Sequence, residues 1–373
     1  MRFLHIADLH LGKRMNDVSL IEDQKYILDQ ISDIAEKENV DALLIAGDIY
    51  QNTSPSAEAM NLFNDFVSLI TEKNIVIYAI SGNHDSDSRI AYFSKLLHMS
   101  GVYFSERFTG ALQQFRFCDK FGDIVISLLP YIKPVHVKKF FPDENIESFN
   151  DAISCVIKNS DIDTSKRNII ICHQYITGGA SSDSDFSIGG LDNIDAEVFK
   201  DFDYVALGHL HQAQKIQRET LRYAGSPLKY SFSEVNHKKS VYLVDMKEKE
   251  EIEIKKIPLS ALRDVREVKG SFADIMNMQP SFDYTRVVLT DEIVAPDAMI
   301  TVSTVFPNML SFAVHNSKTQ GETEMSVSEG FEEKSITEVF CDFFKLCNND
   351  CMPSKAHLKM FSEALKKAEE ECE

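Results

Sequence analysis

The chain has 373 residues, 44% of them hydrophobic, so it exceeds one ordinary domain and can bury a sizeable core. Its formal net charge of −19 argues against a simple DNA-binding surface, because affinity for nucleic acid depends mainly on neutralising phosphates. No uninterrupted apolar stretch approaches a membrane span, and the seven cysteines are odd in number and lack a CxxC pair. We therefore expect a protein of a reducing, cytoplasmic compartment.

Five apolar runs end directly before residues that can bind a metal ion. In chain order the runs are 3–6, 42–46, 75–80, 169–172 and 204–207, followed by Asp8 and His10, Asp48, Asn83 with His84 and Asp85, His173, and His209 with His211. Each run predicts a buried strand, and helices are predicted over 18–35 and 55–73 between the first three. In open α/β sheets ligands bind beyond the carboxyl ends of the strands, so these side chains are predicted to share one edge.

Seven of these residues suit a site for two metal ions. They are Asp8, His10, Asp48, Asn83, His173, His209 and His211. Each ion would take four protein contacts and share one ligand, with waters completing its coordination. The shared ligand should be Asp48, because a carboxylate offers two oxygens, whereas an imidazole cannot bridge without losing its remaining proton. Two ions about 3.5–4 Å apart clamp the attacking and leaving oxygens of a phosphoryl displacement, which predicts phosphoester hydrolysis.

The motifs at Asp8 and Asp48 are weak alone, since a strand end with a solvated aspartate and a satisfied histidine is common, whereas those at 82–85 and 208–211 are stronger. The ordered series is the informative signal: D8-x-H10, G47-D48, G82-N83-H84-D85, H173 and G208-H209-x-H211. This series resembles the calcineurin-like metallophosphoesterases. Four longer stretches narrow the resemblance to the SbcD family, the nuclease subunits of bacterial double-strand-break repair complexes. They are MRFLHIADLHLGK at the start, GNHDSDSR at 82–89, GHLHQAQ at 208–214 and YAGSPLKYSFSE at 223–234.

The resemblance implies a division of labour in the site. One metal ion would take Asp8, His10 and His211, the other Asn83, His173 and His209, and Asp48 would lie between them. His84 would face the scissile phosphate as a catalytic group rather than a ligand, and Asp85 would orient its ring. The family metal is usually Mn²⁺, although the residues themselves also suit Fe or Zn.

The resemblance also implies a fold, an activity and partners. The fold would be a four-layer α/β sandwich with two mixed sheets flanked by helices, followed by a small α/β cap and a helical pair. The activity would be that of a 3′ to 5′ exonuclease on duplex DNA ends and an endonuclease on single strands and hairpins. The partners would be DNA, the SbcC coiled-coil ATPase, and a second copy bound through the helices at 18–35 and 55–73. Its cellular location would be the cytoplasm, in association with the nucleoid.

Four segments are predicted along the chain. The nuclease domain spans residues 1–260, and a hairpin of strands at 240–245 and 251–257 closes it. The cap spans 264–315, a polar linker 316–334 and two helices 335–373. The cap is predicted as strand 265–268, a helix capped by Ser271, strand 285–290, a helix entered at Pro296, and strand 309–314. Ser335 with Glu338 should cap the first tail helix, and Ser354 the second. The two helices either fold back on their own domain or dock on a partner, and we expect docking because their apolar stripes need a surface to bury them. The stripes contain Phe340, Phe343, Phe344, Leu358 and Phe361.

Two other functions fit parts of the sequence. A phosphatase or cyclic-nucleotide phosphodiesterase on the same metal core would suit the acidic charge, but it leaves the cap and the docking tail unexplained. A non-catalytic scaffold could keep its metals for stability, but it would have no need for the non-ligand pair His84 and Asp85.

Overall fold

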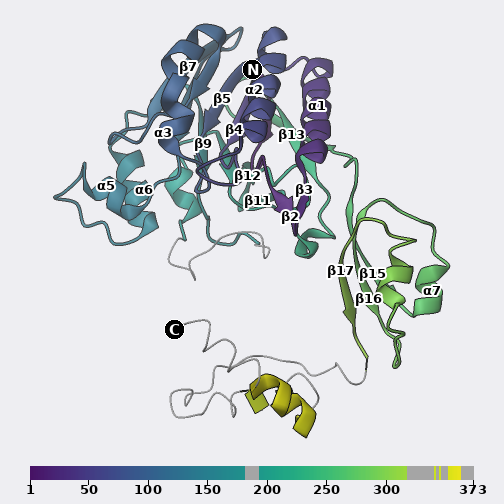
Figure 1. Ribbon diagram of the computed structural model, residues 1–373. Coiled ribbons are helices and arrows are strands. Elements are labelled where there is room, and N and C mark those ends of the chain that lie inside the picture. The colour runs from purple at the N-terminus through teal and green to yellow at the C-terminus, as the bar shows by residue number, and fades with distance from the viewer. Residues whose placement is uncertain (181–192, 317–339, 342–343, 346–351, 363–373) are drawn as a thin grey trace. The chain divides into compact units, whose positions relative to one another are not determined.

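The computed structural model describes residues 1–180, 193–316, 340–341, 344–345 and 352–362 (Figure 1). The chain forms two compact units, Met1–Val265 and Arg266–Glu373. Among the described residues, no helix combines the length and the apolar character needed to cross a membrane.

The first unit contains two six-stranded sheets. The first has the order β14-β13-β1-β4-β5-β6, with β1, β4, β5 and β6 parallel and β13 antiparallel to β1. Its strands are β1 Arg2–Ile6, β4 Ala42–Ala46, β5 Val76–Ile80, β6 Val102–Phe104, β13 Ser240–Met246 and β14 Ile252–Pro258. The β13–β14 pair is the predicted closing hairpin.

The second sheet has the order β11-β12-β10-β9-β8-β7, with β8, β9, β10 and β12 parallel. Its strands are β7 Gln113–Asp119, β8 Gly122–Leu129, β9 Arg167–His173, β10 Tyr204–Gly208, β11 Gln214–Ile216 and β12 Arg218–Tyr223. All seven residues of β9 are buried, as expected of a central strand covered on both faces.

Alternating side chains build the layers. Leu4 and Ile6 of β1 pack in a cluster with residues of the helices α1 (Ile21–Lys37) and α2 (Ala57–Glu72), whereas Phe3 lies in a cluster shared by both sheets. On the outer face of the second sheet, α6 (Phe149–Lys158) contributes Ile153 to a third cluster. Figure 1 shows α1 and α2 beside the first sheet and α6 beside the second. The predicted four-layer sandwich is thereby confirmed.

The first two helices start later than predicted. Val18 and Ser19 form a short strand, β3, paired with β2 (Arg14–Met15), so α1 begins only at Ile21. The second helix is capped by Ser56, whose side chain accepts a hydrogen bond from the Ala59 N–H. The short elements of this unit are α3 Asp87–Ile90, η1 Ala91–Phe93, α4 Ser94–Leu97, η2 His98–Ser100, α5 Pro134–Lys138, η3 Ala196–Phe199 and η4 Phe232–Glu234.

The second unit follows the predicted order of strands and helices. It contains β15 Val265–Gly270, α7 Phe272–Met276, β16 Tyr284–Leu289, α8 Ala298–Val302 and β17 Met309–Val314, with the sheet order β15-β16-β17. Ser271 caps α7 as predicted, since its side chain accepts from the Asp274 N–H. Asn316, the first residue of the predicted linker, donates its side-chain amide to the Asp291 carbonyl at 2.9 Å.

The described part of the tail shows aromatic pairing. The rings of Phe340 and Phe361 stack with centroids 4.0 Å apart, and those of Phe344 and His357 lie 4.9 Å apart. Ser354 accepts from the His357 N–H, which agrees with its predicted capping role. Phe343, the linker residues 317–334 and the capping pair at 335 and 338 lie outside the described residues.

Candidate active site

The side chains predicted to bind metal meet where the two sheets end together. Asp8 and His10 follow β1, Asp48 follows β4, Asn83 follows β5, His173 ends β9, and His209 and His211 follow β10. Asp8, His10, Asp48, His173 and His211 are at least 98% buried. A buried cluster of carboxylates and imidazoles is costly unless its charges are compensated, as they would be by bound cations.

The backbone at this edge is bent into unusual conformations. Asp8, His10, Asp48 and His209 all have positive φ, from 44° to 107°. Such conformations cost free energy in residues other than glycine and concentrate at functional sites. The turns also need close backbone approach, because a Cβ at Gly208 would lie 1.9 Å from the Ala46 carbonyl oxygen.

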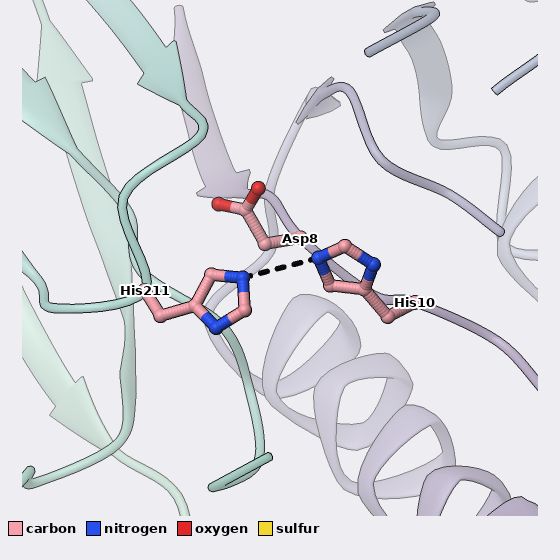
Figure 2. A group of neighbouring side chains, drawn as sticks. All are labelled: Asp8, His10 and His211. Atoms are coloured by element: carbon pink, nitrogen blue, oxygen red, sulfur yellow. Dashed lines mark hydrogen bonds between the residues drawn. The ribbon is translucent and has the colours of Figure 1, made fainter. Parts of the chain in front are cut away.

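One group of candidate ligands consists of Asp8, His10 and His211, whose ligand atoms all lie within 4.8 Å of one another. Figure 2 shows the two imidazoles turned toward each other with Asp8 beside them, and their Nε2 atoms are 3.1 Å apart. Asp48 Oδ2 lies 3.6 Å from His10 Nε2. Each of these residues therefore presents a donor atom to a common point that a cation could occupy.

A second group gathers around Asn83. Its Oδ1 lies 3.0 Å from His173 Nε2 and 3.1 Å from His209 Nδ1. Asp48 Oδ2 is 3.3 Å from His173 Nε2, so this carboxylate lies next to both groups. A donor set of carboxylate, amide oxygen and imidazole suits Mn, Fe or Zn.

The surrounding hydrogen bonds indicate which ring nitrogen His173 and His211 offer. His173 Nδ1 donates to the Ala46 carbonyl at 2.8 Å, and His211 Nδ1 donates to Glu234 Oε1 at 3.1 Å. In their neutral form, both rings are thus left with Nε2 as the lone-pair nitrogen facing the cluster. Such outer contacts orient metal-binding histidines and raise their basicity, so the site fits metal ions in its details as well as its composition.

The electrostatics of the cluster favour a cation. Burial raises the pKa of Asp8 to about 7, against the opposing effect of His173 and His211. Burial lowers the pKa of His173, but the Asp48 carboxylate outweighs it and raises the value to about 9. Burial, reinforced by His173, lowers the pKa of His209 to about 3. Bound divalent cations would keep Asp8 ionised and His173 neutral, which are the forms that act as ligands.

His84 lies beside the ligand groups. Its N–H donates to Asp48 Oδ1 at 2.9 Å, its Nδ1 donates to the Gln51 carbonyl at 2.9 Å, and its ring meets the His10 ring edge-on at 4.9 Å. His84 is also close enough to His10 and Asp48 to form a third possible ligand group. It is only half-buried, so its Nε2 is the ring nitrogen available to a substrate.

The role predicted for Asp85 is wrong. Its two carboxylate oxygens accept the backbone N–H groups of Ile49, Tyr50 and Gly82 at 2.9–3.0 Å. The hydrogen bonds of Asp85 therefore join the turns after β4 and β5, and the Gln51 carbonyl holds the His84 ring instead. Adjacency in sequence suggested the pairing, but at this turn the carboxylate faces the backbone N–H groups of the turn after β4.

Glu234, a residue with no predicted role, lies on the Nδ1 side of the His211 ring. Glu234 is fully buried, and besides His211 it contacts Lys239 Nζ and, at 3.4 Å, Ser226 Oγ. Burial raises its pKa, but His211, His237 and Lys239 more than reverse this and hold the pKa well below the usual range. Its place at the end of the YAGSPLKYSFSE stretch was the only available signal.

Comparisons with known proteins show which proteins this chain is similar to. Residues 1–213 match the family model described as calcineurin-like phosphoesterase, and residues 261–348 match the Type 5 capsule protein repressor C-terminal domain. The SbcD subunit of the nuclease SbcCD from Staphylococcus epidermidis is 34% identical over 322 residues, covering 84% of this chain and 85% of that protein. The protein of the same name from Staphylococcus saprophyticus is 32% identical over 320 residues, covering 83% and 84%. A dimetal phosphatase from Danio rerio, whose structure is solved, is 11% identical, with a TM-score of 0.43 over 69% of this chain and 96% of its own.

Proposed function

Because the chain belongs to the calcineurin-like phosphoesterases and, within them, to the family of SbcD nuclease subunits, we propose that it is a metal-dependent nuclease that hydrolyses the phosphodiester bonds of DNA. The observation that carries the proposal is the pair of adjacent ligand groups that share Asp48. Two ions held by such groups would stabilise the attacking and leaving oxygens of an in-line displacement at phosphorus.

The residues are assigned to the ions by their contacts. Asp8, His10 and His211 would hold one ion, Asn83, His173 and His209 the other, and Asp48 both. The ions proposed are Mn²⁺, which accepts this mixture of carboxylate, amide and imidazole ligands. When bound, they supply Lewis acidity at the phosphate and an activated water.

The remaining chemistry belongs to His84. The Gln51 carbonyl accepts from Nδ1 and would stabilise the protonated ring, which leaves the Nε2 side to contact the phosphate. A proton held there can pass to the leaving oxygen as the phosphodiester bond breaks. Asp85 supports this arrangement indirectly, because it ties together the two turns that carry Asp48 and His84.

The partners follow from the same family membership. We propose that the protein assembles with the SbcC ATPase, with the aromatic residues of the tail as anchors, and that it acts in double-strand-break repair as a 3′ to 5′ exonuclease and a single-strand and hairpin endonuclease. A partner that holds the DNA would offset the chain's formal charge of −19. The described residues of the tail that suit such a contact are half-buried, namely Phe340, Phe344, Leu358 and Phe361.

A homodimer through α1 and α2 is a further part of the proposal. Both helices bury one stripe on the first sheet, yet Tyr26 and Met60 remain 41% and 42% exposed on them. Replacing Met60 with Glu should shift the protein toward the monomer in light scattering coupled to gel filtration. A dimer that persists unchanged would place the contact elsewhere.

The central test compares three substrates. Duplex DNA with a free end, bis(p-nitrophenyl) phosphate and p-nitrophenyl phosphate are incubated with the protein in Mn²⁺, in Mg²⁺ and in chelator. A nuclease should cleave DNA, should also cleave the small diester more weakly, and should lose both activities in chelator. After chelation, added Mn²⁺ should restore DNA cleavage better than added Mg²⁺, because imidazole ligands suit Mn²⁺ better.

A phosphatase or cyclic-nucleotide phosphodiesterase remains the second candidate on the same ligands. It would cleave a small ester efficiently and leave the duplex end intact. Full DNA cleavage in chelator would instead contradict a metal-dependent mechanism.

A further inference from the structure

A strongly basic stretch, residues 133–139, follows the loop after β8. It contains three lysines and a histidine and no acidic residue, in a chain whose formal charge is −19. This stretch includes the short helix α5. Local positive charge of this kind draws in phosphate despite the opposite average charge of the surface.

The basic stretch lines a cavity of about 270 Å³. Phe108 and Phe140 form an apolar wall, with ring centroids 5.5 Å apart in an edge-to-face arrangement. Arg107 and Lys139 bring positive charge to its lining, and the acidic residue there is Asp87, whose Oδ2 lies 3.8 Å from Arg107 Nε. An apolar wall beside cationic side chains matches the two halves of a nucleotide, its base and its phosphate.

The cavity lies next to the candidate metal centre. Strands β8 and β9 are parallel with Leu129 opposite Cys172, so the loop that lines the cavity starts beside His173. The Tyr131 ring meets the His173 ring edge-on at 6.4 Å, and the Tyr131 N–H donates to the Ser81 carbonyl at 2.9 Å, just before Asn83. Tyr131 therefore belongs both to the cavity wall and to the surroundings of two candidate ligands.

The charges around His136 create a positive local environment. Partial burial lowers the pKa of His136, and the charges of Lys139, Lys133 and, more weakly, Arg107 lower it further, with Asp87 opposing them. The charges of Lys139, Lys133 and Arg107 therefore favour the binding of an anion at this position.

We propose that this cavity binds one nucleotide of the DNA strand, next to the phosphate that is cleaved. Arg107 and Lys139 would contact its phosphate, and Phe108, Phe140 and Tyr131 would contact its base. The volume lies just below the roughly 300–1,000 Å³ of small-molecule sites, which fits a single nucleotide and not a duplex. This inference rests on the proposed nuclease function and adds to it the site that positions the strand.

The test uses the full chain with Mn²⁺ and a single-stranded oligonucleotide. Lys139→Glu should raise KM and lower the dependence of log KM on log salt by about one, the signature of a lost phosphate contact. Phe140→Ala should raise KM by roughly ten-fold, within the range for removing a stacked base. Neither change should alter the rate with bis(p-nitrophenyl) phosphate, which needs only the metal edge.

The matched control is Lys120→Glu. It makes the same charge change at an exposed lysine just before the start of β8. The cavity follows the other end of this strand, whose eight residues span about 26 Å. Its KM and salt dependence should equal those of the wild type. If both lysine changes raised KM equally, the effect would come from the net charge of the protein, and the proposed cavity site would be wrong.

Equilibrium binding of thymidine 5′-monophosphate separates the two proposals. Lys139→Glu and Phe140→Ala should each weaken nucleotide binding several-fold. If both variants bind the nucleotide with wild-type affinity, the cavity site is wrong, whether or not the protein cleaves DNA. Conversely, a wild type that binds the nucleotide and cleaves the small diester but leaves DNA intact would contradict the nuclease function alone.

Discussion

Replacement of Glu234 by Gln tests whether a residue outside the ligand set controls metal binding. Glutamine keeps the volume and an oxygen that can accept from His211 Nδ1, but it removes the negative charge behind the ring. Changes of this kind behind a metal-binding histidine typically weaken metal affinity by about 10- to 100-fold. We therefore expect a loss of roughly 1.4–2.7 kcal/mol in the binding of the ion that His211 contacts.

The structure predicts a second effect, on folding. Lys239 is nearly buried and donates to Glu234, to Ser226 Oγ and to the His211 carbonyl. Removing one partner of a buried ion pair costs about 3–5 kcal/mol, so the single variant should also unfold at a lower temperature. The double variant Glu234→Gln with Lys239→Met removes both charges and should regain stability without regaining metal affinity.

Titration calorimetry with Mn²⁺ measures the affinity, and calorimetric unfolding of the metal-free chain measures the stability. Glu197→Gln, at a residue that is 72% exposed, is the matched control and should change neither. Unchanged Mn²⁺ affinity of the single variant would refute the positioning role. Affinity fully restored in the double variant would show that the unpaired lysine, rather than the lost carboxylate, had disturbed the site.

Three further predictions follow. Changing His84 to Gln should leave two ions bound, by calorimetry, yet slow DNA cleavage by roughly 100- to 10,000-fold; loss of an ion would instead make His84 a ligand. Changing Phe340 and Phe344 to Ser should abolish co-purification with SbcC and preserve cleavage of accessible ends, and undiminished co-purification would place the contact elsewhere. Asp119 is mostly buried against Arg167, which outweighs burial and holds the pKa of this carboxyl below its usual range. Asp119→Asn should therefore destabilise the fold by about 1–3 kcal/mol at pH 7. Urea unfolding should show the difference in stability between variant and wild type shrinking as the pH falls below about 4. A difference that stays constant with pH would contradict the lowered pKa of Asp119.

The sequence by itself determined the scaffold and the candidate ligand set. Buried strands have a local signature, and polar residues directly after them must lie at the carboxyl edge, so the residues around Asp8, Asp48 and His173 could be placed together from the order of residues alone. The Ser271 cap was equally local, because its acceptor and the Asp274 N–H are three residues apart.

Tertiary structure decided which groups face one another. Asp85 could be paired with His84 by adjacency alone, yet its oxygens reach N–H groups 35 and 36 residues away. Glu234 lies 23 residues from His211, and Tyr131 lies 42 from His173, so no local pattern connects either pair. Hydrogen bonding and charge pairing depend on distances in space, and these are set only when the two sheets pack and bring the ends of their strands to one edge.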